Sequence, residues 1–420
     1  MVPPPFGTRL PYLRVPGNAR CAWSSALGWP PHGAPLSSAD AINNALPNVM
    51  RLGLDGLRLM SKRLGVGRYI EYMLRYWPDR SHPFSEIVVY APAALPPALR
   101  LHESIHVETL GPRLPPAVWE HVVFPLRKPR DDVFFCPSYV VPLLSRARPV
   151  VVTHHGSYEA LPSAFPWWPR TRARFVYQES CRRADVVITV SESSRDDIVR
   201  FYGIDPGKIR VIPEGVDEAF KPIDDEARLD ARRRSYFADG RPYILFVGKM
   251  TARRHVPDLV EAFRRLVANS KIPHGLVLLG PDTVGHRLPE RFAALGITER
   301  VVHREFATHE ELLEAYNAAD VFIYPSDYEG FGIPVLEAIA CGTPAITLNN
   351  SAFPEFAGGI AYFARDGSPP ALEEALADVL GARDMRAAVR RDGPKRAEAY
   401  HWRRIAYRTM DVLSEFAGAK

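Results

Sequence analysis

Short apolar runs alternate with amphipathic stretches along this chain from about residue 50 onward. The runs typical of buried strands lie at residues 52–55, 87–90, 133–136, 150–153, 186–190 and 209–212, and then at 243–248, 275–280, 321–325 and 344–348. Between several of them, apolar residues recur at helical spacing, most clearly over 193–202, 256–267 and 310–319. Strands that alternate with helices in this way predict an α/β fold built on parallel sheets.

The alternation forms two halves, separated by a segment in which Pro213, Gly215 and Pro222 interrupt both patterns. A chain of 420 residues also exceeds what one ordinary hydrophobic core holds. We therefore predict two Rossmann-like domains, over residues 50–219 and 220–395, that face each other across a cleft. Open parallel sheets bind ligands beyond the carboxyl ends of their strands, so loops of both domains should line this cleft.

Residues 1–49 are unlike the rest, with nine prolines and little periodicity, and we predict a disordered extension there. The net charge of +5 suits anionic small molecules but is too diffuse to predict a nucleic-acid partner. No apolar run approaches the roughly 18 residues that span a bilayer. The four cysteines are scattered, as is usual in a reducing compartment, so a cytoplasmic location is expected.

The stretch PSDYEGFGIPVLEAIACGTP, residues 325–344, carries the most specific pattern. Its tripeptide Gly330-Phe331-Gly332 follows a predicted strand, and the nearby proline suits the first turn of a helix. A glycine-rich loop that opens onto a helix N-terminus offers free backbone N–H groups and the positive end of the helix dipole. The sequence therefore predicts an anion-binding loop.

Two glutamates eight positions apart, Glu329 and Glu337, flank this loop. Glu337 lies among small and apolar residues, where glutamate is rarely buried without a partner. Because a carboxylate would repel a phosphate, we predict that Glu337 accepts hydrogen bonds from paired hydroxyls, such as those of a ribose. Glu329 would then face the group on the far side of the phosphates. An alternative is that Glu337 only balances the helix N-terminus, although Pro334 stands where a capping box needs Ser or Thr.

A basic turn follows the predicted strand at 243–248, where Gly248 and Lys249 come first and Arg253 and Arg254 precede the next helix. Arginine matches phosphate oxygens, which suggests that this turn neutralises a diphosphate. A solvated surface turn is the alternative. The chain has no Asp-x-Asp pair to hold a bridging metal. Since arginines and helix dipoles can neutralise the same charge, no metal and no other cofactor are expected.

The segment EGFGIPVLEAIACGTPAIT resembles the E-x7-E segment of the retaining GT-B glycosyltransferases, a large group that includes bacterial mannosyltransferases and sucrose synthases. The similarity covers nearly all of residues 50–410. RLGLDGLRLMSKRLGVGRY resembles the family's first strand and glycine loop, VVTHHG its central histidine segment, RVIPEGVD its linker and FVGKMTARRHVPDLVEAF the opening of its nucleotide domain. EAYHWRRIAY resembles the family's last helices, which implies that residues 396–420 cross back onto the first domain.

The resemblance implies a role for each matching position. Glu337 would hold the donor ribose, Glu329 would contact the donor sugar, and His155 would lie beside the transferred sugar. The other donor-binding positions would be Gly248, Lys249, Arg253, Arg254, Gly330, Phe331 and Gly332. Gly65 and Gly67 would let a first-domain loop approach the donor phosphate and the acceptor.

Three positions depart from the family pattern. Arg254 replaces the usual lysine, His255 replaces the usual Asn or Gly after it, and Glu214 stands where the linker usually has Asn. None of these changes removes a positive charge that a diphosphate needs. Together, however, they weaken the inference of this chain's donor sugar from the resemblance to the family.

Some of these positions also allow a plainer interpretation. His155 follows a strand and has His154 beside it, so it could be a structural histidine, and the two glycines of the first loop could simply serve a tight turn. Ser191 is expected to be a helix N-cap. The segment FPWWPRTRARF, residues 165–175, is either a membrane-interface patch or a surface loop with partly buried aromatic residues.

The implied reaction moves a sugar from a nucleoside diphosphate-sugar to a hydroxyl acceptor with retention of configuration, in polysaccharide or glycolipid assembly. The GVGRY loop favours a mannose-type donor such as GDP-mannose over UDP-sugars, and the acceptor would be a saccharide or a lipid-linked molecule. A lipid-linked acceptor would bring the protein into peripheral contact with the inner face of the membrane. Two other hypotheses are a nucleotide-sugar epimerase of the same architecture and a non-catalytic nucleotide-sugar-binding partner subunit.

Overall fold

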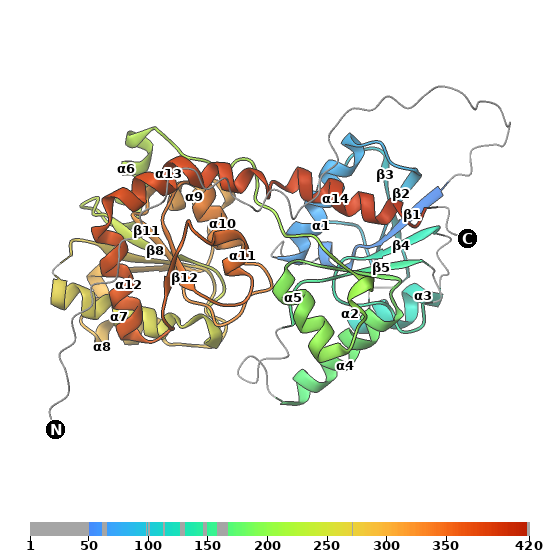
Figure 1. Cartoon of the computed structure of the whole chain (residues 1–420), viewed down its shortest axis with the longest axis horizontal. Helices are drawn as coiled ribbons and strands as arrows, with labels where there is room; N and C mark the ends of the chain where they lie inside the picture. Colours follow the sequence, from blue (N-terminus) through green and yellow to red (C-terminus); the bar gives the residue numbers. More distant parts are fainter. Residues whose placement is uncertain are drawn as a thin grey trace. The chain divides into compact units, whose positions relative to one another are not determined.

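The computed structural model describes residues 50–417, except for short segments at 61–64, 98, 100, 112–113, 127–130, 146–148, 158–166 and 271, and it describes 167–170 and 270 by their backbone alone. The predicted extension over residues 1–49 lies outside the described residues. The described chain contains two parallel sheets with helices around them, which confirms the predicted α/β fold (Figure 1).

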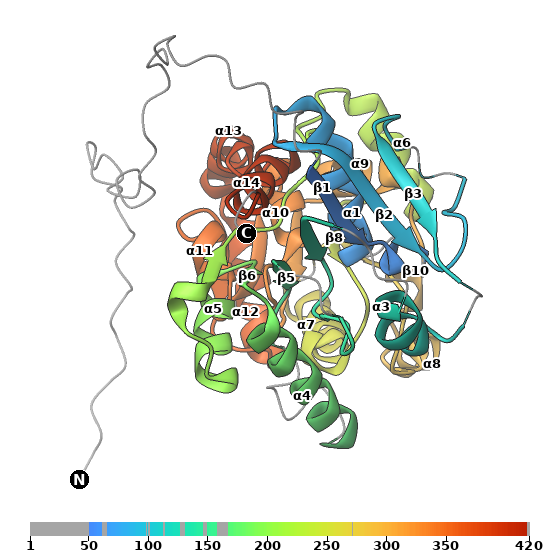
Figure 2. The ribbon, with the colours of Figure 1, turned by 90° about the vertical axis from the view of Figure 1, so that its right-hand side faces the viewer.

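The first sheet has seven strands in the order β3-β2-β1-β4-β5-β6-β7, and every neighbouring pair is parallel. Its strands are β1 (Met50–Asp55), β2 (Phe84–Ala91), β3 (Ile105–Thr109), β4 (Val133–Cys136), β5 (Val150–His154), β6 (Val186–Thr189) and β7 (Ile209–Val211). Figure 2 shows β1, β2 and β3 side by side at one end of this sheet. The hydrophobic pattern missed β3 because this edge strand buries one residue and exposes the other four.

The second sheet has six parallel strands in the order β10-β9-β8-β11-β12-β13. They are β8 (Tyr243–Val247), β9 (Gly275–Leu279), β10 (Val301–Arg304), β11 (Val321–Tyr324), β12 (Ala345–Leu348) and β13 (Tyr362–Ala364). The four predicted strands are the fully buried ones. The two that the pattern missed, β10 and β13, are edge strands that are only partly buried.

The helices connect consecutive strands and cover the sheets. Their bounds are α1 (Val66–Tyr76), α2 (Pro116–Val118), α3 (Phe124–Leu126), α4 (Trp167–Arg183), α5 (Glu192–Asp197), α6 (Glu226–Tyr236), α7 (Val256–Ser270), α8 (Leu288–Ala294), α9 (His309–Ala318), α10 (Ile333–Ala340), α11 (Phe353–Ala357), α12 (Pro369–Gly381), α13 (Arg383–Glu398) and α14 (Trp402–Ser414). Ser191 caps α5 as expected, because its hydroxyl accepts a hydrogen bond from the Ser194 backbone N–H at 3.0 Å.

The chain passes between the two domains twice, and the two crossings are hydrogen-bonded to each other. The Val216 backbone N–H donates to the Tyr400 carbonyl at 2.9 Å, and the Trp402 N–H donates to the Val216 carbonyl at 3.2 Å. Beyond this point α14 packs on the first domain beside α1 (Figure 1), and its Trp402 ring stacks on Tyr72 with centroids 4.9 Å apart. The linker and the last helix therefore form one joint between the domains.

We expect Gly215→Ala to loosen this joint. A Cβ at this position would lie 2.6 Å from Trp402 Cδ2, and the ring is buried and held by Tyr72, so the clash cannot be relieved cheaply. The free energy of unfolding, measured by urea denaturation, should fall by about 1–3 kcal/mol. Gly381→Ala at the end of α12 is the matched control, since its Cβ would meet none of the described atoms within 4 Å. Equal urea midpoints for the two variants would contradict a rigid joint.

Candidate functional site

The predicted glycine loop connects β11 to α10 and lies against the other domain. A Cβ on Gly330 would sit 1.8 Å from the His155 carbonyl oxygen, so glycine alone allows this approach between the domains. Gly332 has φ of 110° and directly precedes α10, where a side chain would be strained. Phe331 is buried and stacks on Phe356 at 4.7 Å, which anchors the loop to the second domain's core. The aromatic ring of the loop therefore packs into the core of the second domain.

Glu329 is almost fully buried, with 5% of its surface exposed, and it is surrounded by donors. Arg254 Nε lies 2.8 Å from its carboxylate and Arg253 Nη2 lies 3.1 Å away. The hydroxyls of Ser326 and Tyr324 donate to the same oxygen at 3.0 and 3.1 Å. Burial alone would raise the pKa of Glu329, but the charges of Arg254 and Arg253 outweigh it and lower this pKa below its ordinary value. Glu329 is therefore a buried anion that gathers both predicted phosphate-binding arginines.

The arginines come from a 3-10 turn, Ala252–Arg254, that follows β8 and precedes α7. Arg254 also donates to the Lys249 carbonyl at 2.7 Å, whereas the Lys249 side chain is exposed. A Cβ on Gly248 would lie 3.1 Å from the Arg254 guanidinium, so this glycine keeps room for the turn.

The contacts of His255 show how histidine is accommodated where the family usually has Asn or Gly. Its φ of 48° lies in the left-handed region, which Asn and Gly adopt most easily. Here the imidazole holds that conformation by bridging Asp258 at 2.9 Å and Asp327 at 2.8 Å. The basic turn thus keeps its shape without the family's usual residue.

Glu337 has the partner that its burial requires. Arg68 Nη2 lies 3.1 Å from one carboxylate oxygen, and the Tyr316 hydroxyl donates to the other at 2.9 Å. Glu337 is the fifth residue of α10 and 2% exposed, so it does not cap the helix, and the alternative that it only balances the helix N-terminus loses its support. Arg68 belongs to α1 of the first domain, where the sequence alone did not single it out. No local signal could have identified it, because the two residues are 269 positions apart.

His155 follows β5 and is buried, with both ring nitrogens in hydrogen bonds. Nδ1 lies 2.9 Å from the Glu214 carboxylate, and Nε2 lies 2.8 Å from the Pro137 carbonyl, to which it donates. The part of His155 that meets the glycine loop is its backbone carbonyl. His154 is fully buried beside Tyr202, and burial together with the neighbouring histidine lowers its pKa to about 3. Of the two histidines, His155 is the one whose backbone carbonyl lies against the glycine loop of the second domain.

Gly65 and Gly67 lie at the start of α1. Gly65 precedes the helix with φ of 56°, and Gly67 is buried in the first turn, where a Cβ would approach the Arg58 carbonyl to 3.2 Å. They shape the turn that places Arg68, while the preceding residues 61–64 lie outside the described part. Of the segment 165–175, the described side chains of Arg172, Arg174 and Phe175 are exposed.

The structure also contains a second pair of buried acidic residues, Asp55 and Glu120, which the sequence analysis did not single out. Asp55 ends β1 and Glu120 lies on the π-helical turn Trp119–Val123; both are buried, and each has one oxygen without a hydrogen-bond partner among the described residues. Burial raises the pKa of both carboxyls, and together with the charge of Asp55 it brings the pKa of Glu120 to about 8. The pair should therefore hold a proton at neutral pH.

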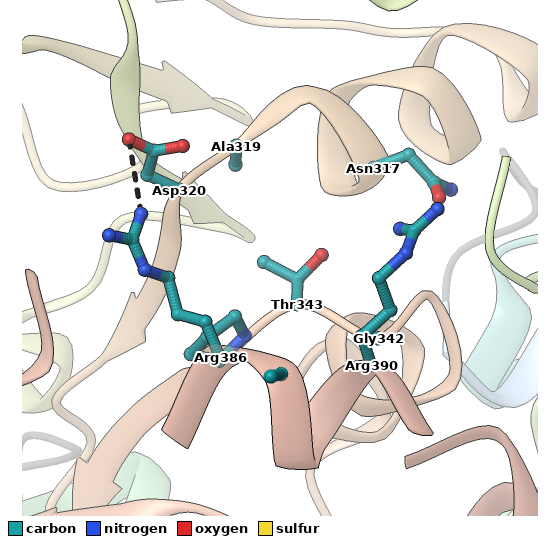
Figure 3. A pocket seen from close by; sticks show the side chains of 9 residues that line it. Asn317, Ala319, Asp320, Gly342, Thr343, Arg386 and Arg390 are labelled. Carbon is teal, nitrogen blue, oxygen red and sulfur yellow. Dashed lines mark ion pairs between the residues drawn. The ribbon is translucent and has the colours of Figure 1, made fainter. Parts of the chain in front are cut away.

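A pocket of about 210 Å³ is lined by other residues, among them Asn317, Asp320 and Arg386 (Figure 3). It borders Asp320 and Pro344, which precede β11 and β12, whereas the glycine loop follows the carboxyl end of β11. Its Arg386 lies 3.5 Å from Asp320, and its Arg390 pairs with Asp224 at 2.8 Å. The lining of this pocket includes neither of the two glutamates nor the basic turn, so we place the candidate site at the glycine loop.

Family models match both halves of the chain. Residues 64–220 match "Glycosyltransferase Family 4" and residues 228–396 match "Glycosyl transferases group 1". The chain is 27% identical over 295 residues to O-antigen chain mannosyltransferase B of Escherichia coli, an alignment that covers 68% of this chain and 75% of that protein. It is 32% identical over 264 residues to a D-inositol 3-phosphate glycosyltransferase of Geodermatophilus obscurus, covering 58% of this chain and 55% of that protein's length.

A solved structure supports the same fold. HepE of Anabaena, crystallised in complex with UDP-glucose, matches with a TM-score of 0.71 and 16% identity over 87% of this chain and 100% of that one. Among the helices that the structure describes, none combines the length and apolar character that a membrane crossing requires.

We predict that Glu120→Gln changes the pH dependence of stability. The unfolded chain releases the Glu120 proton near pH 4.5, whereas the folded protein keeps it up to about pH 8. The stability that the protonated carboxyl contributes is therefore complete below pH 4.5 and is lost as the pH rises to 8, by up to about 1.4 kcal/mol per pH unit. Urea denaturation at pH 5, 6, 7 and 8 should show a shallower decline for Glu120→Gln than for the wild type. Glu290→Gln, at an exposed position, should follow the wild type; parallel curves for all three proteins would contradict a protonated pair.

Proposed function

The chain belongs to the GT-B glycosyltransferases, and from that premise we propose that it transfers a sugar from a nucleoside diphosphate-sugar to a hydroxyl acceptor with retention of configuration. The observation that carries the proposal is the pair of buried glutamates around the glycine loop. Glu329 contacts two arginines, and Glu337, on α10, is held by Arg68. A buried anion beside surplus cations is suited to binding a sugar diphosphate.

The second domain would bind the donor. Glu337 would accept hydrogen bonds from the two ribose hydroxyls, because each of its oxygens keeps a lone pair beyond those used by Arg68 and Tyr316. Arg253 and Arg254, with Lys249 and the N-terminus of α10, would stabilise the charge that develops on the diphosphate leaving group. These groups would serve without an obligatory metal. Glu329 would contact the donor sugar.

The first domain would bind the acceptor. The close approach of Gly330 to His155 places the end of β5 beside the glycine loop, so a sugar held by the loop would lie near both domains. Contact between these loops would also limit hydrolysis by excluding water. The similarity to a mannosyltransferase of O-antigen chains favours GDP-mannose and a saccharide or lipid-linked acceptor, while the complex of HepE with UDP-glucose keeps UDP-sugars as the second donor class.

Glu337→Gln should weaken nucleotide binding. The amide keeps the size of the side chain but replaces a charged acceptor, so the loss should be about 1–3 kcal/mol. Calorimetric titration with GDP, UDP, GDP-mannose, UDP-glucose and UDP-N-acetylglucosamine should show one nucleotide class binding the wild type. Glu373→Gln is the control, because Glu373 of α12 likewise pairs with an arginine, Arg265 of α7, and is not part of the candidate site. Equal binding by wild type and Glu337→Gln would remove the ribose assignment.

Glu329→Gln should separate binding from catalysis. The glutamine oxygen can still accept from Arg253 and Arg254 and keep them ordered, while the negative charge that opposes a phosphate is removed, so affinity for the nucleoside diphosphate should be kept or increased. Slow release of the nucleoside diphosphate from the donor, measured without added acceptor, should fall by about 100-fold or more. Release at the wild-type rate would contradict a contact between Glu329 and the reacting sugar. A wild type that binds the donor and never turns it over would favour the non-catalytic subunit.

A further inference from the structure

Arg68 brings a charge of the first domain to the proposed nucleotide site. It stands on α1, directly after the turn of Gly65 and Gly67, and its guanidinium lies 3.1 Å from Glu337 on α10. The Glu337 side chain is 2% exposed and that of Arg68 is 23% exposed, so this ion pair is largely shielded from solvent. Burial alone would lower the pKa of Arg68, but the Glu337 charge more than offsets it and raises this pKa. Arg68 therefore stays charged beside the Glu337 carboxylate.

Two further residues, Tyr72 and Asp217, connect Arg68 to the joint between the domains. Tyr72 lies one turn further along α1, where residues four apart share a face of the helix, and its hydroxyl group helps to raise the pKa of Arg68. That hydroxyl donates to the carboxylate of Asp217, which also accepts the Ala219 backbone N–H at 2.9 Å. Asp217 follows Val216, the linker residue bonded to the last crossing. Arg68 and Tyr72, four residues apart on α1, thus lie between Glu337 on α10 and Asp217 of the linker.

We propose that Arg68 is a positioning residue for the nucleotide: it aims the Glu337 carboxylate at the ribose and ties that carboxylate, through Tyr72 and Asp217, to the interdomain linker. The inference rests on the proposed function, because it takes Glu337 as the ribose acceptor. Arg68 and Tyr316 each engage one carboxylate oxygen, which fixes the plane of the group and leaves one lone pair on each oxygen for two adjacent hydroxyls.

A ribose-specific probe distinguishes positioning from a merely structural role. GDP, UDP and their 2′,3′-dideoxy forms are titrated into the full-length wild type, Arg68→Met and the control Arg264→Met, whose guanidinium pairs with Glu261 at the surface of α7. The wild type should prefer the ribose-bearing nucleotide over its dideoxy form. Arg68→Met should lose about tenfold in affinity for the ribose-bearing form and stay within about twofold for the dideoxy form. Arg264→Met should match the wild type with both.

Each other outcome counts against the proposal in its own way. If Arg68→Met binds GDP or UDP as tightly as the wild type or more tightly, then Arg68 competes with the ribose or only supports the fold, and the proposal is overturned. Equal losses with both nucleotide forms would also overturn it, since they would indicate a general distortion. A wild type that does not distinguish ribose from dideoxyribose would show that the ribose role of Glu337, and with it the proposed donor site, is wrong.

Thermal unfolding shows whether Arg68→Met folds. If it does not, Tyr72→Phe is the second variant that tests the proposal. This variant keeps the stack on Trp402 and removes only the hydroxyl between Arg68 and Asp217. It should weaken binding of the ribose-bearing nucleotide by about two- to fivefold and leave the dideoxy form unchanged. Unchanged binding of both forms by a folded Tyr72→Phe would overturn the connection to the linker.

Discussion

Two buried carboxylates, Glu329 and Glu337, determine how the elements of this site are arranged. An ionised carboxylate taken out of water without a partner costs several kcal/mol, so each one requires a cation or several donors at a defined place. Glu329 meets this requirement within its own domain, through Arg253 and Arg254 on the turn between β8 and α7. Glu337 meets it through Arg68 of the other domain. The charges therefore specify the position of the basic turn on one side and of α1 on the other.

The linker between the domains contacts the first domain near both glutamates, because two of its acidic residues bond to different parts of that domain. Glu214 bonds to His155, whose carbonyl lies against the glycine loop, and Asp217 bonds to Tyr72 beside Arg68. Between them, Val216 is bonded to the last crossing. The linker therefore contacts both the end of β5 and the middle of α1. The unusual Glu214 thus has a physical role, since an asparagine there would remove the negative charge that faces the imidazole.

Much of the fold could be predicted because buried strands carry their own signal. The apolar runs identified the central strands of both sheets, whereas β3, β10 and β13 were missed because an edge strand exposes residues that no longer look apolar. For the site, the burial of Glu337 predicted a partner but not its identity. Pairing between residues 269 positions apart depends on how two domains pack, which a local pattern does not contain. For the same reason, the sequence marked Gly330 as a loop glycine and could not show that it fits against His155.

The contact between Glu329 and the two arginines also changes how the basic turn should be understood. Free arginine side chains each carry about 2 kcal/mol of conformational entropy, which a ligand would have to overcome to order them. Here Glu329 already orders both guanidiniums, and Arg254 is further held over the Tyr324 ring at 5.0 Å. Two cations with one anion leave a net positive charge for the proposed diphosphate. A carboxylate beside a phosphate site, which looks repulsive in the sequence, thus preorganises the groups that would bind the phosphate.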